Sequence, residues 1–158
     1  MNSRKNFSIY LAFILMIAGY SSTSGQTVNV TGSLAETQLK RGSSVKGRVV
    51  LSIPEGLHVN SNKPDSEYAI PTTVRITGEG FKLGSIDYPS GQNRKFQFSE
   101  VDLNVYEGEV TIPFTLTVPR GFRGSSLTVK AVVRYQACTD EVCYPPRNKE
   151  ITMTAAVR

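Results

Sequence analysis

Apolar and polar residues alternate along three segments in the second half of the chain. These segments are residues 110–118, 127–136 and 151–155, and in each of them nearly every second residue is apolar. Alternation with a period of two is typical of a strand that buries one face and exposes the other. No segment after Gln26 shows a convincing helical period. The pattern therefore predicts strands in all three segments.

Shorter and weaker apolar runs predict further strands, separated by turn sequences. The runs cover residues 28–31, 45–53, 57–60, 73–77 and 81–86. Glycine and proline mark turns at residues 54–56, 78–80, 88–91 and 119–121. About seven to nine short strands with frequent turns are typical of an all-β, immunoglobulin-like β-sandwich. Pro113 has no N–H to donate, so its strand is predicted to lie at an edge or to carry a bulge.

Residues 1–25 have the layout of a secretory signal peptide. Arg4 and Lys5 precede a 14-residue apolar run over residues 7–20, and small and polar residues follow it. A membrane span needs about 20 apolar residues, although an uncleaved anchor is an alternative. We expect cleavage near Gly25, one domain over residues 26–158, and no membrane span after cleavage. The protein is then periplasmic or otherwise extracytoplasmic, where thiols form and exchange disulfides.

Composition excludes several classes of site. The 158 residues include one histidine and two cysteines, too few for a histidine metal cage or a four-thiolate zinc site. The formal charge is +5, but no dense basic patch is interleaved with aromatic residues, so we expect no nucleic-acid binding. We also expect no bound metal and no cofactor.

The two cysteines lie between the last two predicted strands. Four residues separate Cys138 from Cys143, which suits a hairpin tip, with Cα atoms roughly 4.5–5.5 Å apart if the two residues face each other. A disulfide there closes only a six-residue loop and stabilises the fold by about 2 kcal/mol at most. Odd-numbered side chains over residues 127–135 face inward, so the same alternation predicts that the Cys138 side chain faces outward. An outward side chain is accessible, and thiol–disulfide exchange requires access to the thiol. A redox pair, a structural disulfide and a metal clip all remain open.

The residues around the cysteines lead to two more predictions. Asp140 and Glu141 lie between the cysteines, and nearby carboxylates raise the pKa of a thiol. We therefore expect thiols that are sluggish in the free protein and react mainly when a partner docks. If Cys138 pairs with Cys143, the same register places Val129 opposite Thr152, although Ile151 and Met153 are the residues expected to face inward. One extra residue is needed to correct this register, so we expect a bulge near Pro145 and Pro146.

His58 is the one histidine of the chain, in the motif Leu57-His58-Val59-Asn60. No Ser–His–Asp or Cys–His arrangement follows from the spacing. A lone histidine in a strand is more often a structural or surface residue, and we interpret it so.

Three motifs together resemble a known family, over roughly residues 39–157. They are Tyr-Gln-Ala-Cys…Cys-Tyr-Pro-Pro at 135–146, Leu-His-Val-Asn-Ser-Asn-Lys-Pro at 57–64 with Ile-Pro-Thr-Thr at 70–73, and Tyr-Glu-Gly-Glu-Val-Thr-Ile-Pro at 106–113. The combination is similar to the N-terminal domain of the thiol:disulfide interchange protein DsbD family. The resemblance implies an immunoglobulin-like domain in which Cys138 and Cys143 form the redox pair. It also implies that Cys143 attacks the partner and that Cys138 resolves the mixed disulfide.

The same resemblance implies a cap loop whose aromatic side chain shields the cysteines. Here that loop falls in residues 92–100, with Phe98 as the candidate cap and Phe96 as a second cap or pocket candidate, or else a core residue. Tyr135 and Tyr144 are expected to line the same pocket. The implied partners are a thioredoxin-like or membrane-embedded electron donor and periplasmic thiol–disulfide proteins as acceptors. Because this sequence has no Cys-x-x-Cys motif, we expect separate proteins to supply those parts, or the domain to serve another use.

Two classes of function therefore compete. One is a redox carrier of protein-disulfide reductase type, which passes electrons through Cys138 and Cys143. The other is an exported, non-catalytic binding module with a permanent disulfide. A carbohydrate-binding module is disfavoured because the sequence has no tryptophan.

Overall fold

The computed structural model describes residues 27–158, and the predicted signal peptide lies outside the described residues. Twelve strands form in this range: β1 (Asn29–Leu34), β2 (Gln38–Leu39), β3 (Ser44–Ser52), β4 (His58–Asn60), β5 (Thr73–Thr77), β6 (Lys82–Ile86), β7 (Gln92–Arg94), β8 (Leu103–Tyr106), β9 (Glu109–Thr117), β10 (Ser126–Tyr135), β11 (Ala137–Cys138) and β12 (Arg147–Val157). Over the same range, no helix is long and apolar enough to cross a membrane.

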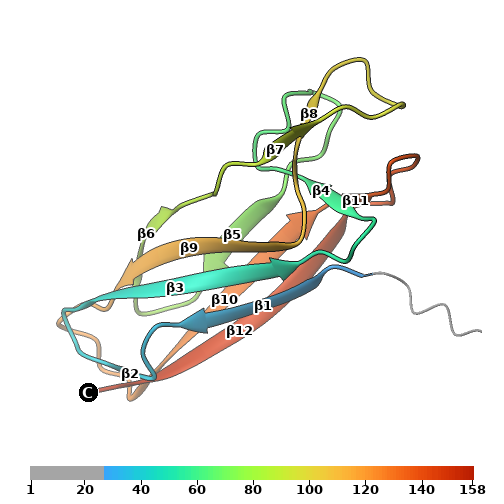
Figure 1. Cartoon of the computed structure of the whole chain (residues 1–158). Coiled ribbons are helices and arrows are strands. Elements are labelled where there is room, and N and C mark those ends of the chain that lie inside the picture. Colours follow the sequence, from blue (N-terminus) through green and yellow to red (C-terminus); the bar gives the residue numbers. More distant parts are fainter. Residues whose placement is uncertain (1–26) are drawn as a thin grey trace, which may run out of the picture.

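Two four-stranded sheets pack face to face (Figure 1). One has the order β1-β3-β9-β6 and the other the order β2-β12-β10-β5. All pairings in the two sheets are antiparallel except that of β2 with β12, which is parallel. The predicted all-β, immunoglobulin-like sandwich is confirmed.

The alternation seen in the sequence builds the core between these sheets. In β9 and β10 every second side chain is buried, from Val110 to Leu116 and from Leu127 to Tyr135. Gly47 of β3 lies opposite Phe114 of β9, and the aromatic ring covers the glycine so closely that a Cβ atom would clash with it. A large side chain on one strand thus fills the space that its partner leaves open.

A third sheet, with the order β11-β4-β8-β7, extends one end of the sandwich (Figure 1). Three of its strands, together with β2, were not predicted, which is why the described residues hold twelve strands rather than seven to nine. These strands are two to four residues long, too short to show a period. The third sheet matters here because β11 carries Cys138.

The prediction that Pro113 lies in an edge strand is wrong, because β9 lies between β3 and β6. The alternative prediction, a bulge in the strand of Pro113, is not met in β9 either, because the extra residue lies in the neighbouring strand β6. Pro113 accepts a hydrogen bond from the backbone N–H of Asp87 (2.9 Å), and its missing N–H faces the same side. On that side the register of β6 shifts between Leu83 and Ile86, so the regular ladder is already interrupted.

Candidate functional site

A disulfide joins Cys138 to Cys143 at the tip of a tight hairpin. The two Cα atoms are 4.0 Å apart, slightly closer than predicted, and the residues form an isolated antiparallel bridge. Backbone hydrogen bonds close the hairpin on both sides of this bridge, from Thr139 N to Val142 O (2.8 Å) and from Tyr144 N to Ala137 O (2.9 Å). The backbone itself therefore holds the two cysteines together.

The bulge predicted near Pro145 and Pro146 is confirmed by the register. Tyr135 pairs with Arg147 and Cys138 pairs with Cys143. Two residues separate the first members of these pairs, but three separate the second members, so one extra residue lies on the side of the two prolines. The Gln136 amide donates to the carbonyl oxygen of Tyr144 (3.2 Å) across this irregular stretch.

The prediction that Cys138 is outward and accessible is wrong: Cys138 is 0% exposed, whereas Cys143 is exposed. Strand parity failed because the chain leaves β10 at Gln136 and enters a different sheet. In β11, Cys138 pairs with His58 of β4 rather than continuing along β12. The disulfide therefore combines one buried cysteine with one exposed cysteine.

An aromatic stack lies on the Cys138 face of the third sheet. The His58 ring stacks on Phe96 with ring centroids 4.1 Å apart, and Phe96 stacks on Phe98 at 5.3 Å. Phe96 is buried in a small cluster with Leu103 and Val105. Phe98, the candidate cap, ends the stack and is 43% exposed.

His58 is a buried histidine, and sequence reasoning did not anticipate its surroundings. Its Nε2 atom is buried and has no hydrogen-bond partner among residues 27–158. Burial lowers the pKa of His58 below its ordinary value of 6.5, and Arg94 lowers it further, while Glu107 and Asp140 oppose the shift. The ring is therefore held neutral near pH 7.

This lowered pKa makes the stability of the protein depend on pH. The unfolded chain binds a proton at His58 near pH 6.5, whereas the folded chain binds it only at lower pH. The contribution is present above pH 6.5 and is lost as the pH falls below it, by up to about 1.4 kcal/mol per pH unit. We expect denaturant unfolding of the oxidised protein to show a falling free energy from pH 6.5 to 5 and a flatter profile for His58→Phe. Equal profiles for both proteins would contradict this.

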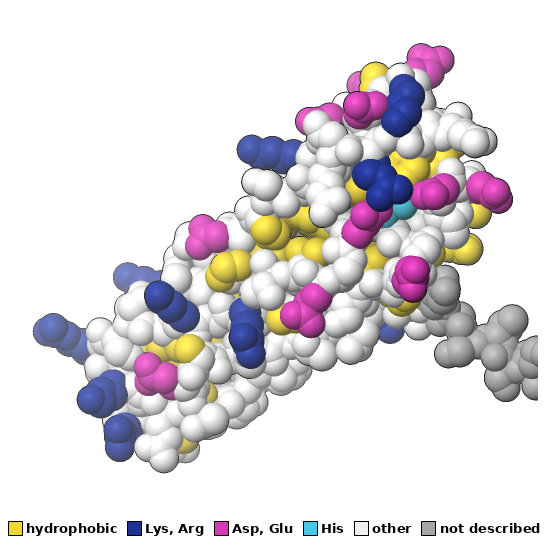
Figure 2. All heavy atoms as spheres, in the orientation of Figure 1, with side chains coloured by type: hydrophobic (Ala, Val, Ile, Leu, Met, Phe, Trp, Pro, Cys, Tyr) yellow, Lys and Arg dark blue, Asp and Glu magenta, His cyan; other side chains and the backbone are white. Residues whose placement is uncertain are grey.

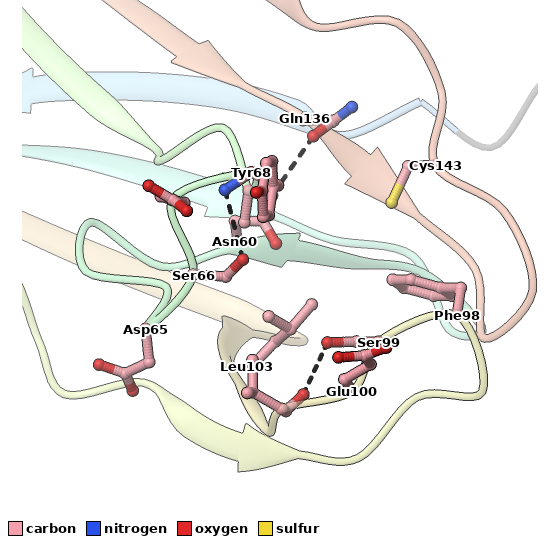
Figure 3. A pocket seen from close by; sticks show the side chains of 13 residues that line it. Asn60, Asp65, Ser66, Tyr68, Phe98, Ser99, Glu100, Leu103, Gln136 and Cys143 are labelled. Carbon is pink, nitrogen blue, oxygen red and sulfur yellow. Dashed lines mark hydrogen bonds between the residues drawn. The ribbon is translucent and has the colours of Figure 1, made fainter.

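A pocket of about 520 Å³ opens beside the disulfide. Figure 3 shows the Cys143 side chain directed into it on the side of Phe98. Leu103 and the 65–69 loop line the opposite part. Asn60 connects two segments next to the pocket, since its side-chain amide donates to the Ile70 carbonyl (3.0 Å) and to Gln136 Oε1 (3.4 Å). The structure thus brings the cap candidate and the exposed cysteine to one cavity.

The other predicted site residues are distributed differently. Tyr135 is buried in the sandwich core, because it continues the inward parity of β10, and it does not line the pocket. Tyr144 directly follows Cys143 and is exposed, and it does not line the pocket either. Asp140 and Glu141 are exposed at the hairpin tip, and Asp140 also lines a second cavity together with His58.

Acidic side chains dominate the surroundings of the pocket. Asp65, Glu67 and Glu100 line it, and no lysine or arginine does. Figure 2 shows Asp and Glu gathered at the end of the molecule that carries the third sheet, whereas Lys and Arg dominate the opposite end. The positive net charge of the sequence is therefore not the charge that a partner meets at the disulfide.

Comparison with known proteins gives the family. The sequence model of the family described as "Thiol:disulfide interchange protein DsbD, N-terminal" matches residues 30–155, which is most of the chain. The chain belongs to the DsbD N-terminal domain family. The resemblance inferred from the sequence motifs is thereby confirmed.

Two known proteins are similar to this chain. The thiol:disulfide interchange protein DsbD of Actinobacillus pleuropneumoniae serotype 5b (strain L20) is 18% identical over 141 residues, which are 89% of this chain and 23% of the relative. The N-terminal periplasmic domain of ScsB from Proteus mirabilis superposes with a TM-score of 0.54 at 16% identity, covering 82% of this chain and 47% of that chain. The second comparison supports the fold. The chain spans less than half of the length of either protein.

Proposed function

We propose that this DsbD-type domain carries electrons between extracytoplasmic proteins by thiol–disulfide exchange through Cys138 and Cys143. The observation that carries the proposal is the asymmetry of the disulfide, which joins a buried Cys138 to an exposed Cys143 at the mouth of a pocket. Family membership supports the same chemistry. The predicted signal peptide and the periplasmic ScsB domain support an extracytoplasmic location.

The difference in exposure supports different roles for the two cysteines. In the reduced protein the Cys143 thiolate attacks a partner disulfide, and a mixed disulfide forms while one partner thiolate leaves. The Cys138 thiolate then attacks Cys143 Sγ, the mixed disulfide breaks, and the second partner thiolate leaves. Two electrons pass to the partner, and the Cys138–Cys143 bond forms. Loading by a reduced donor runs these steps backwards, with the donor attacking Cys143.

The partners follow from the family and from the pocket. We propose a thioredoxin-like or membrane-embedded protein as donor and extracytoplasmic thiol–disulfide proteins as acceptors. Phe98 closes one side of the pocket beside Cys143, as expected of a cap that an arriving partner displaces.

A permanent structural disulfide is the competing function. It is disfavoured because a six-residue loop gives at most about 2 kcal/mol in the chain-entropy relation. The hairpin hydrogen bonds on both sides of Cys138 and Cys143 reduce even this gain, since they close the loop without the covalent bond.

Equilibration of the purified protein with glutathione redox buffers tests the proposal. We expect Cys138–Cys143 to equilibrate within minutes while the protein stays folded. Structural disulfides usually have reduction potentials below about −300 mV, and we expect the potential of this pair to be higher than that. Thiol alkylation and mass shift measure the oxidised fraction, and circular dichroism follows the fold. A disulfide that is reduced only after unfolding would establish the structural role instead.

A further inference from the structure

His58 and Cys138 are direct neighbours across two paired strands. Cys138 of β11 is the Cα partner of His58 in β4. Side chains of directly opposed residues project from the same face of a sheet, with Cβ atoms about 4.5–5.5 Å apart. Both residues are buried, at 0% and 1% exposure. The imidazole therefore lies beside the buried end of the disulfide.

The His58 ring is fixed in place, but its Nε2 atom lacks a hydrogen-bond partner. Its stack on Phe96 sets the ring plane, and Nε2 has no hydrogen-bond partner in the part of the chain that the structure describes. An unpaired buried polar atom costs about 1–3 kcal/mol, so such atoms are rare without a reason. In the oxidised protein Cys138 has no S–H to offer, because its sulfur is bonded to Cys143. Reduction creates that donor directly opposite His58.

We propose that His58 accepts the thiol proton of Cys138 and thereby generates the thiolate that resolves the mixed disulfide. This inference rests on the proposed function and adds to it the group that activates the buried cysteine. The need is physical, since a thiol in buried surroundings ionises reluctantly and only the thiolate attacks a disulfide.

The step balances as follows. The proton moves from Cys138 Sγ to His58 Nε2, and the electron pair left on Cys138 attacks Cys143 Sγ. The bond between Cys143 and the partner sulfur breaks, and its electron pair leaves with the partner thiolate. His58 then releases its proton to solvent or to that thiolate. In the loading direction protonated His58 returns the proton to Cys138 as its sulfur leaves Cys143.

The charges around the ring suit a base that works near neutral pH. Burial and Arg94 of β7 keep the imidazole unprotonated and able to accept, while Glu107 after β8 and Asp140 between the cysteines stabilise the imidazolium once formed. A second cavity of about 410 Å³ is lined by His58, Arg94, Glu107 and Asp140, and offers the proton a way to solvent. Arg94 and Glu107 are themselves joined by an ion pair of 2.7 Å.

Reduced protein mixed with 4,4′-dithiodipyridine in a stopped-flow instrument separates the two sulfur steps. Attack by Cys143 releases one thiopyridone, and resolution by Cys138 releases the second. We expect the second phase of the wild type to be nearly independent of pH between about 6.5 and 8, because a neutral His58 takes the proton throughout. Without this base the rate should rise about tenfold per pH unit towards the ordinary thiol pKa of about 8.5 or higher.

Two variants isolate the proton from the packing. His58→Phe keeps an aromatic ring against Phe96, and His58→Gln keeps a polar nitrogen that cannot titrate near neutral pH. For both we expect a second phase at least about tenfold slower at pH 7, with the steep pH profile, and a first phase within about twofold of the wild type. Wild-type rates and a flat profile in a folded His58→Phe protein would overturn the inference. A steep profile in the wild type would overturn it equally.

Failure of the inference differs from failure of the proposed function. If the proposed function fails, the second thiopyridone release is missing in the wild type or the disulfide resists reduction. If only the inference fails, both releases occur and His58 substitutions leave them unchanged. Because His58 is the one histidine in the sequence, its NMR signal in untagged protein gives an independent readout. We expect its pKa to fall further on reduction, because the new S–H donor stabilises the neutral ring, and an identical pKa in both redox states would count against the proton transfer.

Discussion

Replacement of Cys143 by serine is expected to abolish exchange, whereas replacement of Cys138 by serine is expected to stop it halfway. The reason is the difference in exposure, since an incoming protein reaches Cys143 while Cys138 is fully buried. Cys138→Ser keeps the attacking thiol but removes the resolving one, so a mixed disulfide with the partner persists. We expect at least about 100-fold accumulation of mixed disulfide over the wild type in non-reducing mass spectrometry of protein incubated with a disulfide-bonded thioredoxin-like protein.

The matched variant for this experiment is Cys143→Ser, which differs only in which sulfur remains. It should form little mixed disulfide, because the buried Cys138 is the one thiol left. Val142→Ala at the exposed hairpin tip is a control for disturbance of the loop without loss of sulfur. Equal trapping by Cys138→Ser and Cys143→Ser would contradict the assignment of roles, and trapping by neither would favour a structural disulfide.

Phe96→Ala is expected to have the second largest effect, because Phe96 lies in the middle of the aromatic stack. Its ring contacts His58 on one side and Phe98 on the other. Removing a buried phenylalanine costs about 3–5 kcal/mol, and the small size of the cluster with Leu103 and Val105 places this case near the lower end. We expect the free energy of unfolding to fall by about 3 kcal/mol in denaturant titrations of the oxidised protein.

The same variant should expose the buried cysteine in the reduced protein. We expect iodoacetamide to modify Cys138 at least about tenfold faster than in the wild type. Each decrease of 1.4 kcal/mol in the free energy of local opening raises the population of the open, reactive state about tenfold. Phe122→Ala is the control, because Phe122 packs against the main core in the turn between β9 and β10, far from the third sheet (Figure 1). If Phe122→Ala accelerates Cys138 modification as much as Phe96→Ala does, the stack has no specific shielding role.

The long strands were predictable because a single periodic rule governs them. Residues 110–118 and 127–136 alternate strictly, and the structure places β9 and β10 there with the expected buried face. The third sheet was not predictable in this way. Leu103, Val105 and Tyr106 of β8 are all buried, because β8 is covered on both faces and therefore shows no alternation. In β4 all three residues are buried for the same reason.

In the site, too, the features set by local sequence were predictable and those set by distant contacts were not. The cysteine pairing and the bulge near Pro145 follow from local spacing and register, and both are confirmed. The burial of Cys138 depends on a change of sheet at Gln136, where extrapolated parity loses its meaning. The environment of His58 depends on Phe96, which is 38 residues away in the sequence. One available sign was that a titratable residue lies within the apolar run Leu57–Val59.

Folding and formation of the Cys138–Cys143 disulfide are linked in a thermodynamic cycle, to which the hairpin hydrogen bonds contribute. Whatever free energy the disulfide adds to folding, folding must add to the formation of the disulfide, because both paths connect the same four states. The bonds at Thr139 and Tyr144 close the loop in the folded chain, so they raise the effective concentration of one thiol at the other. They also form part of the folded backbone, which need not rearrange for the sulfurs to separate. Oxidised and reduced domains then differ little in shape, so a partner selects between them by the chemistry at one sulfur rather than by a change of fold.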